Sequence, residues 1–532
     1  MKYRPAPIPR DQLVLIPTSL GDLIAADHPI RLFDEILDQL DWKIFEQDYR
    51  VEKRGQPPIA PRILAAVLLF GIHRNVRSSR SLEYQLNCNI EFMWLAHGHK
   101  IDHSTLAAFR SKHTKAIKQL HRELTRFVKK LGLVKLGELY VDGTRIRADA
   151  SRSETLTAEK TLSLLEQIDR ELEERLASME KADQIDELFE TGEHEKLPAN
   201  LRDLKARQAE LQRILETCQE NDQTRKKQGV DPEKNPFQLP ITDQDSRIQP
   251  NKEGGYGPNY TPMIGVEGEL GLIVATAVVN SPNEQDQLIA MVDDVEQGFG
   301  VSVETVYADG AYSIATNVVE LEVVREKEFL SPDRKGDMPA DNPAIRQSPT
   351  DPVAPADLDR LPLNPSTKRF DGEAFLYDPK NDVHYCPAGR ILHRIGIENN
   401  KQRNGQTVQS VLYQGESCAG CELVDRCRPS GEHKNPRKVR RDEHEEARRR
   451  HREMMSDATV KARYRKRFSI GEKPFGHLKR NFAFRRFSVR GHAKVDAEWS
   501  LMATAYNLLR LINHIGSTGT LRRLLGAEAQ MQ

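Results

Sequence analysis

The stretch Leu139-Tyr-Val-Asp-Gly-Thr-Arg145 decides how the fold of this sequence is interpreted. Its side chains alternate between two faces, which predicts a β-strand that ends on the carboxylate of Asp142. A second stretch, Val306-Tyr-Ala-Asp-Gly-Ala-Tyr312, has the same pattern, and its apolar run ends on Asp309. Asp-Gly after a strand is usually an ordinary turn. Each aspartate therefore becomes a candidate site residue only in combination with the other aspartate and with a third segment.

The third segment, Tyr464-Arg-Lys-Arg-Phe-Ser-Ile-Gly-Glu-Lys-Pro-Phe-Gly-His-Leu-Lys479, places one glutamate, Glu472, in a strongly basic stretch. From Lys461 to Arg490 the chain has eleven Lys or Arg residues and one acid. The formal net charge of the chain is +0, which argues weakly against nucleic acid as a partner. Local cation density matters more, because clustered cations release counterions from a phosphate backbone. Because Phe475, Phe482, Phe484 and Phe487 are interleaved with these cations, the stretch favours DNA contact over a solvated basic face.

Two carboxylates at strand ends and a third on a helix are suitable ligands for a pair of Mg²⁺ ions that act on a phosphodiester. We predict that Asp142 bridges the two ions, that Asp309 binds one of them and that Glu472 binds the other. Asp149 and Glu498 are further acids in the same regions, and we rank both below these three.

The three segments resemble those of the DDE transposases of bacterial insertion sequences. Tyr464, Arg467, Glu472 and Lys479 are similar to the Tyr-Arg-Glu-Lys signature of one large branch of that family. The signature usually has three residues between its Arg and its Glu, whereas four separate Arg467 from Glu472, so Arg465 is a second candidate for that arginine. The resemblance continues through short motifs further along the chain: Phe475-Gly476, Phe487, Arg490-Gly491 and Ala505-Tyr-Asn507.

The resemblance implies an α/β fold with an RNase H-like (retroviral integrase-like) mixed sheet, a helical N-terminal domain, a helical insertion and a Cys-rich insertion. The expected order of strand, hairpin, helix and strand, with a right-handed crossover, would bring Asp142 near Asp309. The predicted parts are a helical N-terminal DNA-binding domain (1–130), the first part of the catalytic core (131–154 and 240–330), the helical insertion (155–239), a linker with a Cys-rich, zinc-binding insertion (331–435), the C-terminal helices of the core (436–516) and a tail (517–532). From the residues alone, a merely structural helical domain remains the alternative for 1–130.

Local signals predict several helices. His28-Pro29 and Pro61 are good starts because proline at the first helical position loses no hydrogen bond, and Asp102 offers an N-cap. The last long helices are expected from about Tyr464 to Lys479, with a kink or break at Pro474, and from Val495 to Ile515. On a continuous helix, Lys479 would lie two turns from Glu472 on the same face. A charged helical hairpin is expected from 158 to 218, with Leu162 in its apolar stripe.

The resemblance and the cation density together suggest which side chains bind DNA, although a cap or a surface cation remains an alternative for some of them. The candidates are Tyr464, Arg465, Arg467, Lys479, Arg480, Arg485 and Arg486.

Four cysteines follow one another as Cys-x31-Cys-x2-Cys-x5-Cys at Cys386, Cys418, Cys421 and Cys427. The Cys-Ala-Gly-Cys pair is typical of a zinc knuckle, and in a cytosolic protein a structural Zn²⁺ is favoured over disulfides. Free thiols or a redox pair remain alternatives, and His384 is an alternative fourth ligand. The family often has a Cys-rich insertion at this place.

No stretch reaches the roughly 18 apolar residues of a membrane span, and Met1-Lys-Tyr-Arg-Pro5 has no apolar signal region. We therefore expect a cytoplasmic, nucleoid-associated protein without a membrane partner. The expected function is a DNA transposase that uses two Mg²⁺ ions, cuts at the ends of its element and joins the 3′-hydroxyls to target DNA, as a homodimer or larger assembly on DNA. A metal-dependent nuclease without strand joining and an inactive, domesticated DNA-binding protein are the alternatives.

Overall fold

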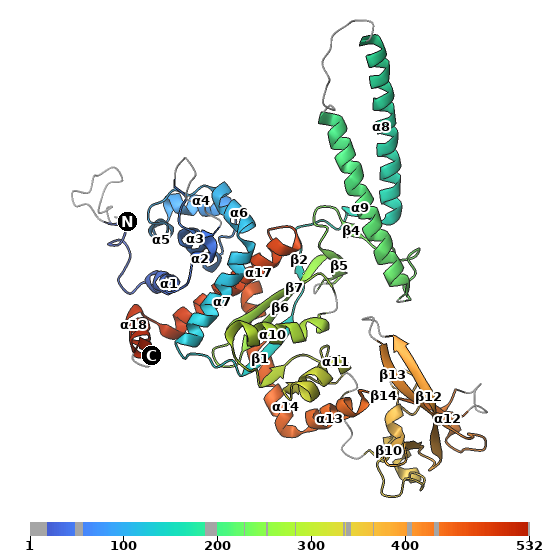
Figure 1. Ribbon diagram of the computed structural model, residues 1–532. Coiled ribbons are helices and arrows are strands. Elements are labelled where there is room, and N and C mark those ends of the chain that lie inside the picture. The colour runs from blue at the N-terminus through green and yellow to red at the C-terminus, as the bar shows by residue number, and fades with distance from the viewer. Residues whose placement is uncertain are drawn as a thin grey trace, which may run out of the picture. The chain divides into compact units, whose positions relative to one another are not determined.

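The computed structural model describes residues 19–47, 57–186, 199–227, 229–251, 254–281, 284–333, 336, 342–364, 366–401, 407–429 and 436–529 (Figure 1). The expectations for residues 1–5 and for parts of 155–239 and 331–435 therefore lie outside the described residues. The chain forms two compact units. The first contains residues 1–284, 290–303 and 468–532, and the second contains residues 285–289 and 304–467.

Helices make up the N-terminal part of the first unit. They are α1 (Pro29–Asp38), α2 (Lys43–Glu46), α3 (Pro61–His73), α4 (Ser79–Cys88), α5 (Ile90–Leu95), α6 (His103–Lys112) and α7 (Thr114–Lys130). The predicted starts are confirmed: α1 and α3 begin at a proline, and the Asp102 carboxylate accepts a 2.8 Å hydrogen bond from Thr105 N at the start of α6. Proline and the aspartate cap both suit the first turn, where backbone N–H groups have no helical partner.

The sheet of the first unit is built around β6 (Tyr256–Glu267). The strand β1 (Glu138–Gly143) pairs antiparallel with its second half, and β7 (Ile273–Val279) also pairs antiparallel with it. The first half of β6 pairs with β2 (Ile146–Arg147) and β5 (Arg247–Pro250). The predicted strand that carries Asp142 and the predicted hairpin of β6 and β7 are therefore confirmed.

The long helix α17 (His492–Ile515) packs against α3, α7 and β7. Its Trp499 donates from Nε1 to the carbonyl of Met263 at 2.9 Å. The side-chain amide of Asn507 accepts from Ile273 N at 2.8 Å and donates to Ile273 O at 2.7 Å. The predicted helix is confirmed, and its buried face fixes the sheet from one side (Figure 1). The last helix, α18 (Thr518–Ala529), follows it.

Two 29-residue helices, α8 (Ala158–Asp186) and α9 (Ala199–Lys227), lie along each other (Figure 1). Their shared core includes Leu165, Ile168 and Ile214, and the short strands β3 (Thr155–Leu156) and β4 (Leu239–Pro240) pair at the base. The prediction that Leu162 belongs to this apolar stripe is wrong: the residue is 45% exposed.

Strands of the second unit pair in two places. In the first, β8 (Thr305–Tyr307) and β9 (Glu328–Leu330) pair in parallel. The second is antiparallel, in the order β10 (Leu376–Asp378), β11 (Val383–Tyr385), β12 (Ile391–Lys401), β13 (Thr407–Gly415) and β14 (Lys438–Asp442). The remaining elements are η1 (Gln285–Gln287), α11 (Ala315–Val318), η2 (Val319–Val324), η3 (Pro355–Arg360), η4 (Gly372–Ala374), α12 (Val424–Cys427), α13 (Glu445–Ser456) and α14 (Ala458–Tyr464).

The prediction of one helix from Tyr464 to Lys479 is wrong. The segment continues from α14 into α15 (Lys466–Ile470), and a separate helix, α16 (Lys473–Arg480), follows. Gly471 is a poor helix former, and Pro474 cannot donate a hydrogen bond inside a helix, but it is well tolerated in a first turn. Glu472 is therefore the N-cap of α16.

The whole is a mixed α/β protein whose strands pair both antiparallel and in parallel. In the described ranges, no helix is long and apolar enough to cross a membrane. The helix α10 (Leu288–Phe299) follows β7 after a short connection that contains Glu284.

Candidate active site

The carboxylate of Asp142 lies at the end of β1 and is 9% exposed. One of its oxygens accepts a 2.9 Å hydrogen bond from Gly143 N, and the residue stands opposite Ile264 on β6. Directly afterwards, Thr144 N donates to Pro262 O at 2.9 Å. These backbone bonds hold the strand end in place, so a ligand bound there would meet a preorganised carboxylate.

A cation from α16 reaches the same strand end. The ammonium of Lys479 donates to the hydroxyl of Thr144 at 2.5 Å, and Thr144 itself is buried. The structure therefore places the ammonium of Lys479, a residue singled out from sequence, on Thr144, two residues after Asp142 in the chain. Glu472, at the start of the same helix, is exposed.

A further carboxylate lies against Gly143. A β-carbon added to this glycine would be 2.0 Å from one carboxylate oxygen of Glu284 and 2.8 Å from its carboxyl carbon. Glu284 therefore occupies the space that a side chain at position 143 would need. Sequence reasoning missed Glu284. The signal was an acid in the connection between the β6–β7 hairpin and α10.

Asp309 lies at the end of β8 in the second unit. Its carboxylate accepts a 2.8 Å bond from Ala311 N, and its carbonyl accepts a 2.6 Å bond from the Ser331 hydroxyl. Because Asp309 belongs to a different compact unit from Asp142, the predicted approach of the two aspartates stays a prediction.

Carboxylate oxygens are the hard ligands that Mg²⁺ prefers, and the ion keeps several of its waters. Asp142 supplies such donors at the end of β1, whereas the carboxylate of Glu284 fills the β-carbon position of Gly143, which points to the other face of the strand. The Asp142 oxygens fit a divalent cation chemically. Among the described residues, no group of three or more His, Cys, Asp or Glu side chains is placed so that it could hold a metal ion.

The basic stretch has a buried side and an exposed side. Phe475, Phe484 and Phe487 are buried, and the first two rings stack on Trp499 at centroid distances of 6.2 and 5.9 Å. The interpretation of these phenylalanines as part of a DNA contact is wrong, because their rings anchor the segment to α17. The cations Arg480, Arg485 and Arg486 are exposed.

Both acids that we ranked below the three main candidates have structural partners. The carboxylate of Asp149 accepts bonds from Arg486 at 2.7 Å and from Arg490 at 2.8 Å. Glu498 is buried and accepts bonds from Ser488 N at 2.8 Å and from its hydroxyl at 2.5 Å. Burial raises the pKa of Glu498. These contacts tie the basic loop to its neighbours, which supports the lower rank of both acids.

The two candidates for the signature arginine differ in exposure. Arg465 is exposed, whereas Arg467 is only 5% exposed. The nearby Arg463 is held by Glu328 through two hydrogen bonds of 2.6 and 2.5 Å, and the bond from Arg463 holds the pKa of Glu328 below its usual range. Arg465 is thus the cation of this group that faces solvent, and Tyr464 beside it is half-buried.

The four cysteines line one cavity of about 450 Å³ in the second unit. Arg390 N donates to the sulfur of Cys386 at 3.3 Å, and Arg437 N donates to the sulfur of Cys418 at 3.3 Å. Burial raises the pKa of the Cys427 thiol to about 11. Backbone donors to sulfur favour thiolates, but burial also raises the pKa of Cys386, and the structure does not gather the four described sulfurs into a metal site.

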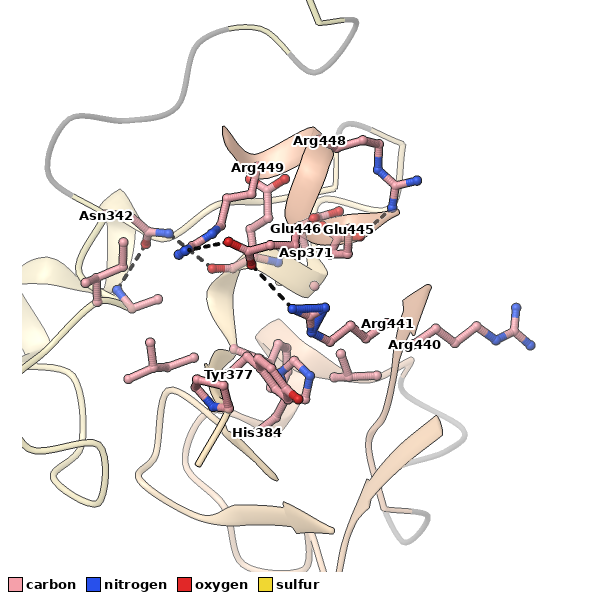
Figure 2. A pocket seen from close by; sticks show the side chains of 18 of the residues that line it. Asn342, Asp371, Tyr377, His384, Arg440, Arg441, Glu445, Glu446, Arg448 and Arg449 are labelled. Carbon is pink, nitrogen blue, oxygen red and sulfur yellow. Dashed lines mark hydrogen bonds and ion pairs between the residues drawn. The ribbon is translucent and has the colours of Figure 1, made fainter. Parts of the chain in front are cut away.

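A larger cavity of about 1130 Å³ lies in the same unit (Figure 2). It is lined by His384, which is therefore separate from the cysteine cavity, and burial lowers the pKa of His384 to about 4. Arg441 lies over the ring of Tyr377 at 4.1 Å, while Arg440 points away from it (Figure 2). This placement favours the four cysteines over a set that includes His384.

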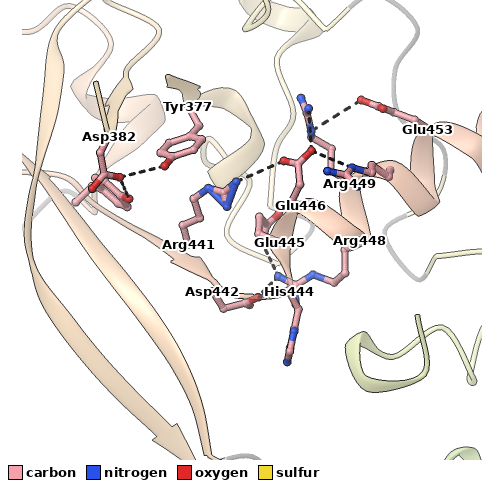
Figure 3. A network of polar contacts seen from close by, with 12 residues as sticks. Tyr377, Asp382, Arg441, Asp442, His444, Glu445, Glu446, Arg448, Arg449 and Glu453 are labelled. Carbon is pink, nitrogen blue, oxygen red and sulfur yellow. Dashed lines mark hydrogen bonds and ion pairs between the residues drawn. The ribbon is translucent and has the colours of Figure 1, made fainter. Parts of the chain in front are cut away.

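The arginines of this larger cavity are paired with acids (Figure 3). Glu446 binds Arg441 at 3.4 Å and Arg449 at 3.5 Å, and Arg448 binds Asp442 at 2.7 Å. Such pairs join α13 to β14, so these cations serve the structure of the unit.

Comparison with known families decides the class of protein. The family described as "Transposase DDE domain" matches residues 385–512, and that described as "Transposase domain (DUF772)" matches residues 18–112. The chain belongs to the DDE transposases of the insertion-sequence type. DNA transposition is thus its general activity. The first match covers Glu472, Lys479 and the cysteines from Cys386, whereas Asp142 and Asp309 lie outside both matches.

No curated protein matches this DDE transposase. Among solved structures, a piggyBac transposase in a synaptic complex with hairpin DNA is similar over 94% of this chain and 79% of its own, at 11% identity and a TM-score of 0.30. A similarity at that level carries no argument about the site.

Proposed function

We propose that this transposase has an RNase H-like catalytic core, cleaves DNA at the ends of its insertion sequence and joins the freed 3′-hydroxyls to target DNA. The observation that carries the proposal is the end of β1, where the buried Asp142 and the ammonium of Lys479 meet through Thr144. An acid and a phosphate-binding cation at one rigid strand end suit phosphodiester chemistry.

Asp142, Asp309 and Glu472 would hold two Mg²⁺ ions, which supply activation of the attacking oxygen and stabilisation of the leaving oxygen. Lys479 would hold a phosphate of the substrate beside Asp142, because an ammonium attracts a phosphate oxygen. Its bond to Thr144 limits where the cation can lie. The acids would therefore orient the reacting groups while the lysine positions the strand.

DNA would follow the exposed cations Arg465, Arg480, Arg485 and Arg486, with the half-buried Tyr464 beside the first of them. The buried position of Arg467 gives it a supporting role in this proposal. The N-terminal helices, in the range of the second family match, would bind the ends of the element. Because two ends must be held together, we propose a dimer or larger assembly on DNA, in the cytoplasm and at the nucleoid.

The test is cleavage of DNA that carries the ends flanking the gene, with Mg²⁺ present. Glu472→Gln should lose cleavage and joining but keep DNA binding. Glu304→Gln, an exposed glutamate outside the proposed triad, is the matched control. Cleavage without joining in the wild type would favour a nuclease, and binding without cleavage would favour a domesticated DNA-binding protein. Full cleavage by Glu472→Gln would remove this residue from the proposed triad.

For the cysteine cavity, we propose one structural Zn²⁺ bound by Cys386, Cys418, Cys421 and Cys427. The turns at Cys386 and Cys418 support it, because each presents a backbone N–H to a sulfur. Purified protein should contain one zinc per chain by mass spectrometry of metals, and Cys421→Ser should lose it. Cys88→Ser is the control, since Cys88 is exposed and belongs to α4. Metal-free wild type that is equally stable would contradict the proposal.

A further inference from the structure

A buried histidine, His451, lies at the centre of a polar network in the second unit. It belongs to α13 and is 0% exposed, and its ring stacks on Phe329 at a centroid distance of 5.4 Å. Its Nδ1 lies 2.6 Å from a carboxylate oxygen of Glu322 on η2. Its Nε2 lies 2.7 Å from the carbonyl oxygen of Ser331, directly after β9, and 3.3 Å from the hydroxyl of Ser313. One side chain without access to water thus joins segments that are far apart in the sequence.

The serine contacts of His451 lie on both sides of the turn that begins at Asp309. The carbonyl oxygen of Asp309 accepts a 2.6 Å bond from the Ser331 hydroxyl and a 3.0 Å bond from Tyr312 N. The carbonyl of Ser331 faces His451 in turn. Tyr312 immediately precedes Ser313, whose hydroxyl faces the same ring nitrogen. His451 therefore supports both of these donors to the Asp309 carbonyl.

The acceptors around the His451 ring decide how it is oriented. A carbonyl oxygen can only accept, so Nε2 carries a hydrogen and donates it to Ser331. Nδ1 shares a hydrogen with the Glu322 carboxylate, and a ring turned over by half a rotation would lose both bonds. A carboxylate that binds one ring nitrogen sets the role of the other nitrogen. Glu322 therefore orients His451 toward the turn that carries Asp309.

We propose that His451, oriented by Glu322, is a positioning residue for Asp309. It holds the backbone of the Asp309 turn through Ser331 and Ser313, so that the aspartate meets a divalent cation without rearrangement. The inference rests on the proposed function, in which Asp309 binds one of two Mg²⁺ ions. His451 itself touches neither the cation nor the DNA in this proposal.

The variants separate the hydrogen bond from the bulk of the side chain. His451→Ala removes the donor, whereas His451→Gln keeps an amide N–H that can reach the place of Nε2. Met455→Ala is the matched control, because it empties a buried position one turn further along α13 and removes no polar group. Thermal unfolding checks that every variant is folded. If His451→Ala unfolds, Ser331→Ala replaces it, because this change removes only the hydroxyl that holds the Asp309 carbonyl.

The first measurement is hydrogen exchange of the backbone amides of residues 308–314, by mass spectrometry, in the protein without metal or DNA. Losing a hydrogen bond changes local opening about 10-fold, so exchange should be about 10-fold faster in His451→Ala and within about threefold of the wild type in His451→Gln. Mn²⁺ binding without DNA, followed by electron paramagnetic resonance, should weaken about 10-fold in His451→Ala, as when groups that support a metal ligand are removed. Cleavage of end DNA by this variant should recover at high Mn²⁺. Met455→Ala should match the wild type in all three measurements.

Unchanged exchange of residues 308–314 in folded His451→Ala, or in Ser331→Ala where it takes its place, would overturn the inference. Equal changes in Met455→Ala would also overturn it, because they would reflect general loosening of α13. So would a loss in His451→Gln as large as that in His451→Ala, because the donor would then not be what holds the turn.

Asp309→Asn separates failure of this inference from failure of the proposed function. If Asp309→Asn keeps wild-type cleavage and Mn²⁺ binding, the proposed role of Asp309 fails, and the inference fails with it. If Asp309→Asn loses both while His451→Ala behaves as the wild type, only the inference about His451 fails.

Discussion

The ends of β1 and β8 carry the same Asp-Gly pair in different surroundings. At β1, Gly143 faces the side chain of Glu284, which can move. At β8, a β-carbon on Gly310 would lie 2.8 Å from the backbone carbonyl oxygen of Pro332, which cannot move without the chain. The first glycine thus makes room for a functional group, and the second lets two backbone segments approach each other.

The two aspartates also differ in the hydrogen bonds that hold them. The backbone N–H that binds Asp142 belongs to the next residue, Gly143, while Asp309 is held by Ala311 N and, at its carbonyl, by the hydroxyl of Ser331. The comparison teaches that the glycine of an identical dipeptide can face a side chain at one strand end and fixed backbone at the other. Only the contacts of the added β-carbon distinguish the two cases.

The largest expected effect is a loss of DNA cleavage, and it should be the same for the aspartate at the end of β1 and the one at the end of β8. Asp142→Asn and Asp309→Asn should each lower end cleavage at least about 1,000-fold, because losing a metal ligand removes several kcal/mol of transition-state stabilisation. DNA binding, followed by gel shift, should stay within about threefold of the wild type, as phosphate contacts dominate affinity. Cleavage that survives in only one of the two variants would break the functional equivalence of the strand ends.

The next effect is on the free energy of unfolding, and it should differ between alanine substitutions at the two glycines. Gly310→Ala should lower the free energy of unfolding by about 1–3 kcal/mol, the usual cost of overpacking against atoms that cannot yield. Gly143→Ala should change it by less than about 0.5 kcal/mol, because a flexible side chain gives way. Denaturant unfolding of both variants measures the difference. Equal losses of unfolding free energy would show that the Glu284 side chain is held as rigidly as the backbone carbonyl of Pro332.

A smaller effect concerns the cation at the Asp142 end. Lys479→Met should weaken binding of end DNA about 10-fold and reduce the slope of log affinity against log salt by about one, as expected for one lost phosphate contact. Lys473→Met is the control on the same helix, where the residue is exposed. If both variants lose the same DNA affinity, Lys479 contributes only its positive charge, and its position near Asp142 makes no specific contribution to binding.

The smallest effect concerns Asp149, which follows the Asp142 end and pairs with Arg486 and Arg490. Asp149→Asn should tighten DNA binding about two- to fivefold at low salt, because both exposed arginines become available to phosphates and such surface pairs are worth under about 1 kcal/mol each. The gain should vanish as salt rises. Weaker binding in this variant would mean that Asp149 orders the arginines for DNA.

Local patterns predicted much of the fold. Proline and aspartate signals placed the starts of α1, α3 and α6, and alternation placed β1, because these features depend on a few neighbouring residues. The continuous helix through Glu472 failed because the competition between helix extension and the Gly471–Pro474 break depends on what the following turn packs against.

The candidate site was predictable to a similar degree. Asp142 and Lys479 stood out through strand alternation and local charge, and the structure joins their neighbourhoods through Thr144. Glu284 could not be found, since its approach to Gly143 depends on the path of the chain after β7. The phenylalanines of the basic stretch were wrongly assigned to DNA contact. Their burial depends on contacts with Trp499 of α17, which lies further along the chain, and local sequence does not show such contacts.

Asn507 has a consequence beyond helix packing. Its amide engages both backbone groups of Ile273, and in the described part of the chain β7 pairs with β6 alone. A side chain thus stands where the first hydrogen bonds of an additional strand would form. Open strand edges promote aggregation when proteins crowd together. The asparagine blocks pairing at this end of β7, using a single amide instead of another strand.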